Sequence, residues 1–307
     1  MGKTAFIFPG QGAQKVGMGN SFYDNSPLAR EIFEQAEAVL GFDVKALCFE
    51  ENDDINQTEY TQVAILTVCA AILAQVNKTQ IKPDVCAGLS LGEYVALYES
   101  NVLSYEDALI TLRKRGILMQ ESVPDGKGSM SAVIGMEAQK IDEICSSVDG
   151  IVSVANYNCP GQIVITGETK AVEEASERLK EAGARRVIPL KVSGPFHSKM
   201  LTGAGEELKK VLDTVKINTP SVPYVANVNA SYVDSDSEIA ALLTQQISSP
   251  VKFMQSVEKM IEDGVDTFIE IGPGKTLSSF VKKINRDVNV INIQTPQDLE
   301  KLGGLQC

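Results

Sequence analysis

The segment 88–92 reads Gly-Leu-Ser-Leu-Gly, which places Ser90 between two glycines in the Gly-x-Ser-x-Gly pattern of serine acyl-transfer enzymes. The apolar run 85–87 before it predicts a buried parallel strand, and apolar residues at helical spacing follow it. A serine at such a strand-to-helix turn exposes its hydroxyl, and the helix N-terminus behind it favours developing negative charge. We therefore predict that Ser90 is a nucleophile. The alternative is a small residue in a tight turn.

A serine hydroxyl is a weak nucleophile unless a base takes its proton. The chain has one histidine, His197, in the segment Gly-Pro-Phe-His that follows a predicted strand. A loop of this kind can project a base into a cleft. If an imidazole activates Ser90, it is that of His197. The alternative is a histidine without a catalytic role.

A cation is predicted on an apolar helix face. A capping box at 104–107 opens this helix, on which Ala108, Leu112, Met119 and Arg115 share one face. A guanidinium on a buried face must find an anion, because an unpaired buried charge is costly. That anion is either a structural carboxylate or the carboxylate of a substrate, which the planar guanidinium can hold with two hydrogen bonds.

The elements around these residues predict an α/β fold in two parts. Between Ser90 and His197 the order is strand, helix, strand, strand, helix, strand, which is ferredoxin-like, over 130–134, 137–148, 151–156, 162–166, 169–182 and 186–192. We predict an α/β-hydrolase-like catalytic domain with a parallel sheet, formed by 1–125 and 196–307, and an inserted ferredoxin-like domain formed by 126–195. Ser90 and His197 are then expected to face a groove between the two domains.

Two glycine-rich loops could suggest nucleotide binding. After a predicted strand at 4–8, Lys15 stands where a dinucleotide fingerprint would have its third glycine. The later segment Gly-Pro-Gly-Lys-Thr at 272–276 resembles a phosphate loop, but Ile269 stands where that loop has its first glycine. We interpret both loops as strand-to-helix turns.

Composition limits the possible partners and compartment. The net charge of −12 disfavours nucleic acid and anionic membranes as partners. The six cysteines show no C-x-x-C spacing, so with a single histidine we expect no metal site and reduced structural thiols in a cytoplasmic protein. The N-terminus lacks a signal-peptide pattern. The apolar stretch 63–76 is expected to be too short to span a bilayer and to belong to a buried helix at 58–76.

Seven motifs in a fixed order carry a resemblance to a known family over nearly the whole chain. They are FPGQGAQ (8–14), GLSLGE (88–93), RKRGILMQ (113–120), NYNCPGQIVITG (156–167), GPFH (194–197), QISSPVKF (246–253) and IGPGKTL (271–277). With these motifs the chain resembles the malonyl-CoA:acyl carrier protein transacylases, the acyltransferase family of fatty acid and polyketide synthesis.

The resemblance implies a ping-pong reaction without a cofactor. Ser90 would take malonyl from coenzyme A, and the phosphopantetheine thiol of acyl carrier protein would take it from Ser90. His197 would act as base and then as acid. The main-chain carbonyl of Gln246 would orient His197 in place of an acidic residue.

The resemblance also implies residues that hold the substrate. Main-chain N–H groups of Gln11 and Leu91 would hold the oxyanion, and Arg115 would pair with the malonyl carboxylate. Phe196 would crowd an α-methyl branch and so favour malonyl; the alternative is a core or lid aromatic. Leu89 departs from the family pattern, which usually has histidine there, and this leaves Arg115 as the main holder of the anion.

An acidic chain needs a local basic patch to meet an acidic carrier protein. The candidates flank the predicted groove, although lysines simply solvated on helix faces are the alternative: Arg185, Arg186, Lys191, Lys275, Lys282, Lys283 and Arg286. Three other functions stay open on sequence alone, namely the acyltransferase of a polyketide pathway, a serine esterase or thioesterase, and a non-catalytic docking domain of the same fold.

Overall fold

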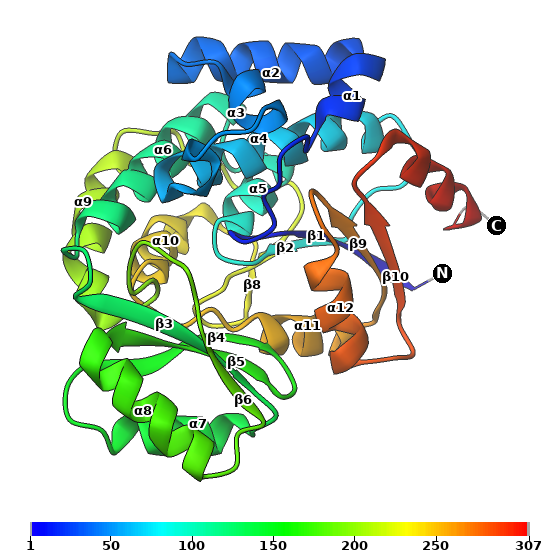
Figure 1. Ribbon diagram of the computed structural model, residues 1–307. Helices are drawn as coiled ribbons and strands as arrows, with labels where there is room; N and C mark the ends of the chain where they lie inside the picture. The colour runs from blue at the N-terminus through cyan, green and yellow to red at the C-terminus, as the bar shows by residue number, and fades with distance from the viewer. Residues whose placement is uncertain (1, 306–307) are drawn as a thin grey trace.

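A six-stranded sheet forms the centre of the larger part of the molecule in the computed structural model, which describes residues 2–305 (Figure 1). Its strand order is β10-β9-β1-β2-β7-β8, and every neighbouring pair is parallel except β7 and β8. The strands are β1 (Lys3–Phe8), β2 (Val85–Gly88), β7 (Tyr224–Val225), β8 (Tyr232–Val233), β9 (Val265–Ile271) and β10 (Asn289–Ile293). Phe8 pairs with Gly88, so the loops after β1 and β2 leave the same edge of the sheet side by side.

Helices cover both faces of this sheet because its strands carry apolar residues on both sides. Along β1, Phe6 and Phe8 pack into one hydrophobic core, whereas Ala5 and Ile7 pack into the other. The helices of this part are α1 (Asn20–Asn25), α2 (Pro27–Leu40), α3 (Val44–Phe49), α4 (Thr58–Val76), α5 (Gly92–Glu99), α6 (Tyr105–Glu121), α9 (Thr202–Leu212), α10 (Ile239–Gln246), α11 (Phe253–Glu262) and α12 (Thr276–Ile284), with 3-10 turns at Asp54–Asn56, Lys199–Leu201, Asp236–Glu238 and Pro296–Leu305.

The helix α4 has the bounds predicted for the buried helix, 58–76, and so extends beyond the apolar stretch 63–76. With 19 residues it is long and apolar enough to cross a membrane by those two measures alone. In the fold 78% of its apolar window is buried, mainly against α2 and α6, as in the core helix of a globular protein. The apolar composition of α4 is therefore explained by its burial in the protein core.

The smaller part is a four-stranded antiparallel sheet with two helices on one face (Figure 1). Its order along the chain is β3 (Gly128–Ile134), α7 (Ala138–Ser146), β4 (Val152–Cys159), β5 (Gln162–Glu168), α8 (Thr169–Glu181) and β6 (Arg186–Pro189), and in the sheet β4-β5-β3-β6. The predicted order of elements is confirmed. The last strand ends at Pro189 rather than at 192, and an irregular segment leads from there to His197.

Main-chain hydrogen bonds join the two parts directly. Val251 donates its N–H to Ala155 O (2.8 Å) and accepts from the N–H of Tyr157 (2.9 Å). The strand β4 is therefore anchored to the segment before α11 and packs against α11 and α12. The five cysteines within the described range are unpaired and buried, namely Cys48, Cys69, Cys86, Cys145 and Cys159, whereas Cys307 lies outside that range.

Candidate active site

Ser90 sits on a sharp turn between β2 and α5. Its φ of 56° lies in the left-handed region, which costs energy for a residue with a side chain. The two flanking glycines make the turn possible. A Cβ on Gly88 would lie 2.0 Å from the carbonyl carbon of Gly92, and a Cβ on Gly92 would lie 2.2 Å from Phe8 O. The predicted turn is confirmed, with strand and helix in near contact.

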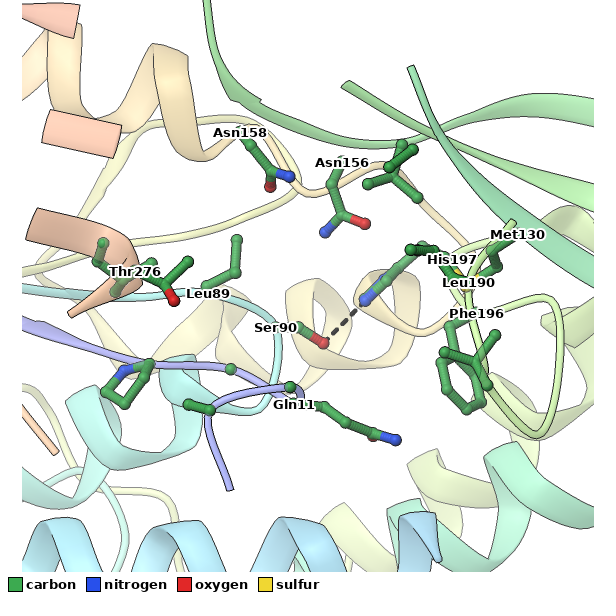
Figure 2. Close-up of a pocket in the computed structure, with 18 of the residues that line it drawn as sticks. Gln11, Leu89, Ser90, Met130, Asn156, Asn158, Leu190, Phe196, His197 and Thr276 are labelled. Atoms are coloured by element: carbon green, nitrogen blue, oxygen red, sulfur yellow. Dashed lines mark hydrogen bonds between the residues drawn. The ribbon is translucent and has the colours of Figure 1, made fainter. Parts of the chain in front are cut away.

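A continuous hydrogen-bond chain connects Ser90, His197 and Gln246. Ser90 Oγ lies 2.8 Å from His197 Nε2 (Figure 2). His197 Nδ1 lies 2.8 Å from the main-chain oxygen of Gln246. A carbonyl oxygen only accepts, so Nδ1 carries the proton and Nε2 is free to accept from the serine hydroxyl. The structure thus brings together three residues that are far apart in the sequence, in the order that base catalysis requires.

The environment of His197 keeps its imidazole neutral. The residue is buried, and burial together with the nearby Arg115 guanidinium lowers the pKa of His197 from 6.5 to about 4. Both effects disfavour the imidazolium. At neutral pH the ring is therefore present in the form that can take a proton.

Arg115 on α6 is fully buried beside the serine. Its Nη1 donates to Gln62 Oε1 (2.7 Å), and its Nη2 donates to Ser90 Oγ (3.1 Å) and to Gln246 Oε1 (2.9 Å). Burial lowers the pKa of Arg115 from its usual value. Among residues 2–305 no carboxylate lies within 4.0 Å of this guanidinium. A structural ion pair, the alternative left open by the sequence, is therefore not formed.

Two main-chain N–H groups lie close to the serine without a protein acceptor. Gln11 belongs to the loop after β1, and Leu91 follows the nucleophile directly. Within the part of the chain that the structure describes, neither N–H donates a hydrogen bond. The side chain of Gln11 is turned aside and donates to Thr58 Oγ1 (3.3 Å). Unpaired N–H groups beside a nucleophile are what an oxyanion hole consists of.

A cleft of about 270 Å³ opens above Ser90, between the two sheets (Figure 2). Arg115, Leu91 and Gln246 lie behind it rather than in its wall. Leu89 and Phe196 are in the wall. The wall consists of Pro9, Gly10, Gln11, Gly12, Ala13, Leu89, Ser90, Met119, Met130, Ala132, Asn156, Asn158, Gln162, Val164, Leu190, Val192, Phe196, His197, Thr276, Leu277 and Phe280.

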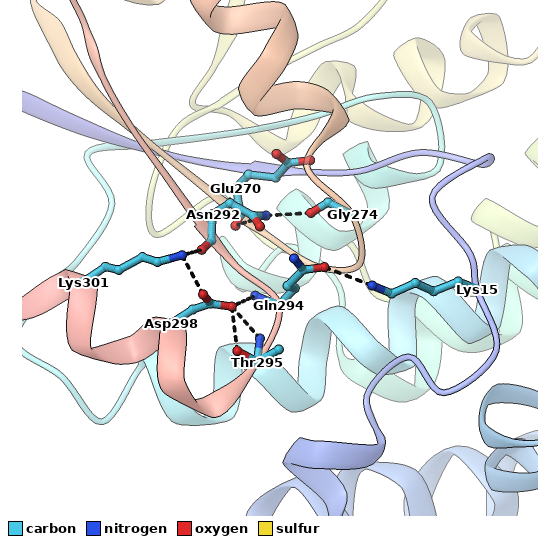
Figure 3. A network of polar contacts seen from close by, with 8 residues as sticks. All are labelled: Lys15, Glu270, Gly274, Asn292, Gln294, Thr295, Asp298 and Lys301. Carbon is cyan, nitrogen blue, oxygen red and sulfur yellow. Dashed lines mark hydrogen bonds and ion pairs between the residues drawn. The ribbon is translucent and has the colours of Figure 1, made fainter.

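The loop before α12 forms one rim of the cleft and is fixed by polar contacts (Figure 3). The buried carboxylate of Glu270 accepts from the N–H groups of Leu277 (3.0 Å) and Ser278 (2.8 Å). Asn292 Nδ2 donates to Gly274 O (2.7 Å). A carboxylate thus occupies the helix N-terminus that a phosphate loop would offer to its ligand. The interpretation of this loop as a strand-to-helix turn agrees with that geometry.

Sequence reasoning missed three polar side chains around the serine. Asn227, two residues after β7, accepts the Ser90 N–H at Oδ1 (2.8 Å) and donates from Nδ2 to Gly88 O (2.7 Å). Gln62 binds Arg115, and Glu93 binds Gln246. Gln62 and Glu93 interrupt apolar helix faces, which is a signal in the sequence. Asn227 gives no local signal, because only the strand order places it there.

All seven predicted carrier-binding cations are exposed, and they come from two segments of the chain, 185–191 and 275–286. Lys191 lies between Leu190 and Val192, and Lys275 precedes Thr276; these apolar and polar neighbours belong to the cleft wall. Lys283 Nζ donates to Gln162 Oε1 (3.2 Å) across the junction of the two parts. Lys282 Nζ donates to Val288 O (2.6 Å) and so connects α12 to the segment just before β10. The remaining three, Arg185, Arg186 and Arg286, lie at β6 and after α12.

The comparisons with known proteins below all indicate the same family of enzymes. The acyl transferase domain family matches residues 5–296. A curated malonyl CoA-acyl carrier protein transacylase from Bacillus subtilis (strain 168) is 46% identical over 304 residues, covering 98% of this chain and 96% of the relative. One from Staphylococcus aureus (strain MRSA252) is also 46% identical, covering 98% of each.

Solved structures give the same result. A malonyl CoA-acyl carrier protein transacylase from Clostridium perfringens superimposes with a TM-score of 0.96 at 47% identity, covering 99% of this chain and 97% of that one. A malonyl-transacylase in complex with its type II PKS acyl-carrier protein has a TM-score of 0.95 at 37% identity, covering 97% and 98%. With these relatives over nearly its full length, the chain belongs to the acyl transferase family and, within it, to the malonyl CoA-acyl carrier protein transacylases.

Proposed function

We propose that this enzyme transfers malonyl from malonyl-CoA to the phosphopantetheine thiol of acyl carrier protein in fatty acid biosynthesis. The observation that carries the proposal is the chain from Ser90 Oγ through His197 to the Gln246 carbonyl, with the Arg115 guanidinium 3.1 Å from the same Oγ. The base can activate the hydroxyl, and the cation beside it can bind a carboxylate. This pair fits an acyl donor, such as a malonyl thioester, that carries a carboxylate of its own.

The first half-reaction forms a malonyl ester on Ser90. Oγ attacks the thioester carbonyl while its proton passes to His197 Nε2, and the oxyanion is held by the N–H groups of Gln11 and Leu91. The C–S bond then breaks, and His197 returns the proton to the departing coenzyme A thiolate. In the second half-reaction the carrier thiol gives its proton to His197, its sulfur attacks the ester, and Ser90 regains its proton. No cofactor is needed.

The malonyl carboxylate is held by Arg115. This requires the guanidinium to exchange its contact with Ser90 Oγ for the carboxylate once the hydroxyl is acylated, while Gln62 and Gln246 keep it in place. Leu89, which stands in the cleft wall, offers no hydrogen bond to the substrate. The ring of Phe196 narrows the cleft beside the nucleophile and disfavours an α-methyl branch.

The carrier protein docks at the mouth of the cleft, beside the exposed Lys191 and Lys275, whose neighbours in the chain line the cleft. A solved relative is in complex with its acyl-carrier protein, which supports an acyl carrier protein as the partner. The contact is transient and electrostatic, because the two partners are acidic overall and meet through a local patch. Neither nucleic acid nor a membrane takes part, and the enzyme acts in the cytoplasm.

We propose that the chain divides into two domains. Residues 126–195 form a ferredoxin-like domain, supported by the order β4-β5-β3-β6 with two helices on one face. Residues 1–125 and 196–307 form an α/β-hydrolase-like catalytic domain, supported by the parallel sheet and the serine at its strand-to-helix turn.

Transfer is distinguished from hydrolysis by following both products. With malonyl-CoA and a holo acyl carrier protein, we expect malonyl-carrier to form much faster than free malonate. A thioesterase would release malonate at the same rate with and without carrier, and a non-catalytic docking domain would form neither. The comparison of a fatty acid carrier with a polyketide carrier, by kcat/KM, separates the two pathways.

A further inference from the structure

One buried carboxylate lies behind the nucleophile, the base and the cation together. Glu93 is on the first turn of α5, three residues after Ser90, and is 1% exposed. Its Oε2 accepts from Gln246 Nε2 (2.6 Å) and from the main-chain N–H of Asn227 (3.2 Å). None of the reaction steps described above uses this residue.

Gln246 has a side chain whose orientation matters. Its Oε1 accepts from Arg115 Nη2 (2.9 Å), while its Nε2 donates to Glu93 and to Ser90 O (3.0 Å). An amide has one accepting and one donating end. A strong acceptor at the donating end therefore fixes the oxygen toward the guanidinium. The main-chain oxygen of the same residue holds His197 Nδ1 (2.8 Å), so Gln246 contacts both the base and the cation.

Asn227 gives Glu93 a second connection to the site. The carboxylate holds the main chain of Asn227, whose side chain accepts the Ser90 N–H and donates to Gly88 O. This bridge spans the turn that carries the nucleophile. Ser90 is in the left-handed region, with a φ of 56°, so its backbone needs support from its surroundings.

We infer that Glu93 is a positioning residue that, through Gln246 and Asn227, fixes the orientation of the Arg115 guanidinium and of the Ser90 turn, and so sets the preference for a malonyl over an acetyl thioester. The inference rests on the proposed function, since it takes Arg115 to hold the malonyl carboxylate.

The hydrogen bonds that Glu93 accepts, rather than its charge, carry this role. No cation forms an ion pair with Glu93 among residues 2–305, and Oε1 has no hydrogen-bond partner there. Burial raises the pKa of Glu93 to about 7, against the opposing effects of Gln246, Asn227 and Arg115. A side chain that kept one acceptor at the position of Oε2 should thus serve nearly as well.

Three variants separate geometry from charge. Glu93→Gln keeps an oxygen for both donors and removes the charge. Glu93→Asp keeps the charge but is one methylene too short to reach both donors. Glu93→Met fills a similar volume without an acceptor. For each, we would measure kcat/KM for acylation by malonyl-CoA and by acetyl-CoA, together with the thermal midpoint.

The wild-type ratio of malonyl to acetyl kcat/KM should be kept within about threefold in Glu93→Gln. It should fall at least about tenfold in Glu93→Met and in Glu93→Asp, because the amide of Gln246 is then free to turn its donor end toward Arg115. A merely structural role would lower the midpoint and slow both thioesters equally. The second buried carboxylate, Glu270, provides that control. Glu270→Met should lower the midpoint but leave the ratio unchanged.

An unchanged ratio in folded Glu93→Asp or Glu93→Met would overturn the inference, as would a ratio in Glu93→Gln that falls as far as in Glu93→Met. If Glu93→Met fails to fold, the Gln and Asp variants still decide. Acylation of the wild-type enzyme by malonyl-CoA tests the proposed function separately. If the wild type is not acylated, the proposed function is wrong, whatever the variants show.

Discussion

At the scale of single residues, Ser90 Oγ has two different neighbours. His197 Nε2 accepts its proton, and Arg115 Nη2 places a positive charge 3.1 Å away. Burial and this guanidinium both lower the pKa of His197, so Arg115 helps to keep the base neutral. Arg115 therefore acts on the hydroxyl, on the base and, under the proposed function, on the substrate carboxylate.

The low pKa of His197 predicts a pH profile. Because the imidazole must be neutral to act as a base, kcat/KM for acylation should stay flat through pH 6.5 and fall only as the pH drops toward the folded value of about 4. Stopped-flow acylation across this range gives the profile. Repeating it in Glu93→Gln removes the titration of Glu93. An inflection near pH 6.5 in both proteins would show that His197 has an ordinary pKa, contrary to this prediction.

The variant His197→Ala should acylate Ser90 more slowly than the wild type by several orders of magnitude at every pH, because the serine hydroxyl then has no base.

Arg115→Ala should reverse the choice between substrates. Malonyl and acetyl thioesters differ by one carboxylate, and a guanidinium without an anion in a buried site is costly. We expect kcat/KM for malonyl-CoA to fall about a hundredfold or more, with acetyl-CoA turnover equal or higher. Both thioesters are measured on both proteins. An equal loss for the two would make Arg115 a structural residue and would place the carboxylate elsewhere.

At the scale of elements, the site depends on how closely β2, α5 and the loop after β1 approach one another. Gly88 meets the backbone of Gly92, and Gly92 meets the backbone at Phe8. No side chain can move aside there, since the contacts are with main-chain atoms. The elbow is therefore a backbone arrangement that tolerates only glycine at its two corners.

Gly88→Ala should unfold or severely destabilise the enzyme. The added Cβ would stand 2.0 Å from a backbone carbon, which we expect to cost about 3 kcal/mol or more. Gly203→Ala is the matched control, because a Cβ there meets nothing within 4 Å and the residue lies in the helix α9. The control should be neutral or more stable by about 0.5–1 kcal/mol. Chemical denaturation of both variants measures the difference, and comparable stabilities would contradict the packing argument.

The local pattern of the sequence predicts these elements well and their long-range contacts poorly. Periodicity and turn residues indicate the strand before Ser90, the capped helix that carries Arg115 and the inserted order of strands and helices. The contacts of Asn227 and Gln62 depend on which strands and helices become neighbours, which no local pattern encodes. The strand β6 ends at Pro189, beyond which the N–H of Leu190 still donates to Met130 O (2.9 Å); a proline inside such a run favours an early strand end.

At the scale of the whole molecule, the net charge of −12 works against an acidic partner. Under the proposed function, exposed cations beside the cleft, among them Lys191 and Lys275, would offset this locally. The two parts of the molecule thus form the cleft and also carry cations near its entrance. Each contributes basic side chains beside the entrance through which a carrier-bound pantetheine arm would reach Ser90.

Charge reversal at the two rims should act on the carrier step. Lys191→Glu with Lys275→Glu should raise KM for the carrier about tenfold at low salt and less at high salt, because salt screens exposed charges. The rate of acylation at saturating malonyl-CoA should stay the same. Reversing Lys209 and Lys210 on α9, remote from the cleft, makes the same change in net charge and should leave KM unaltered. If KM is the same in both double variants at low salt, the patch lies elsewhere.

Under the proposed function, Ser90 carries the acyl group between the two thiols. The most direct measurement mixes the enzyme with malonyl-CoA alone, isolates the protein and locates the modification by peptide mass spectrometry. We predict one malonyl group on Ser90, absent from Ser90→Ala, that disappears on addition of holo carrier protein as malonyl-carrier appears in equal amount. Transfer to the carrier without a malonyl-serine, or a malonyl group on a residue other than Ser90, would contradict the account.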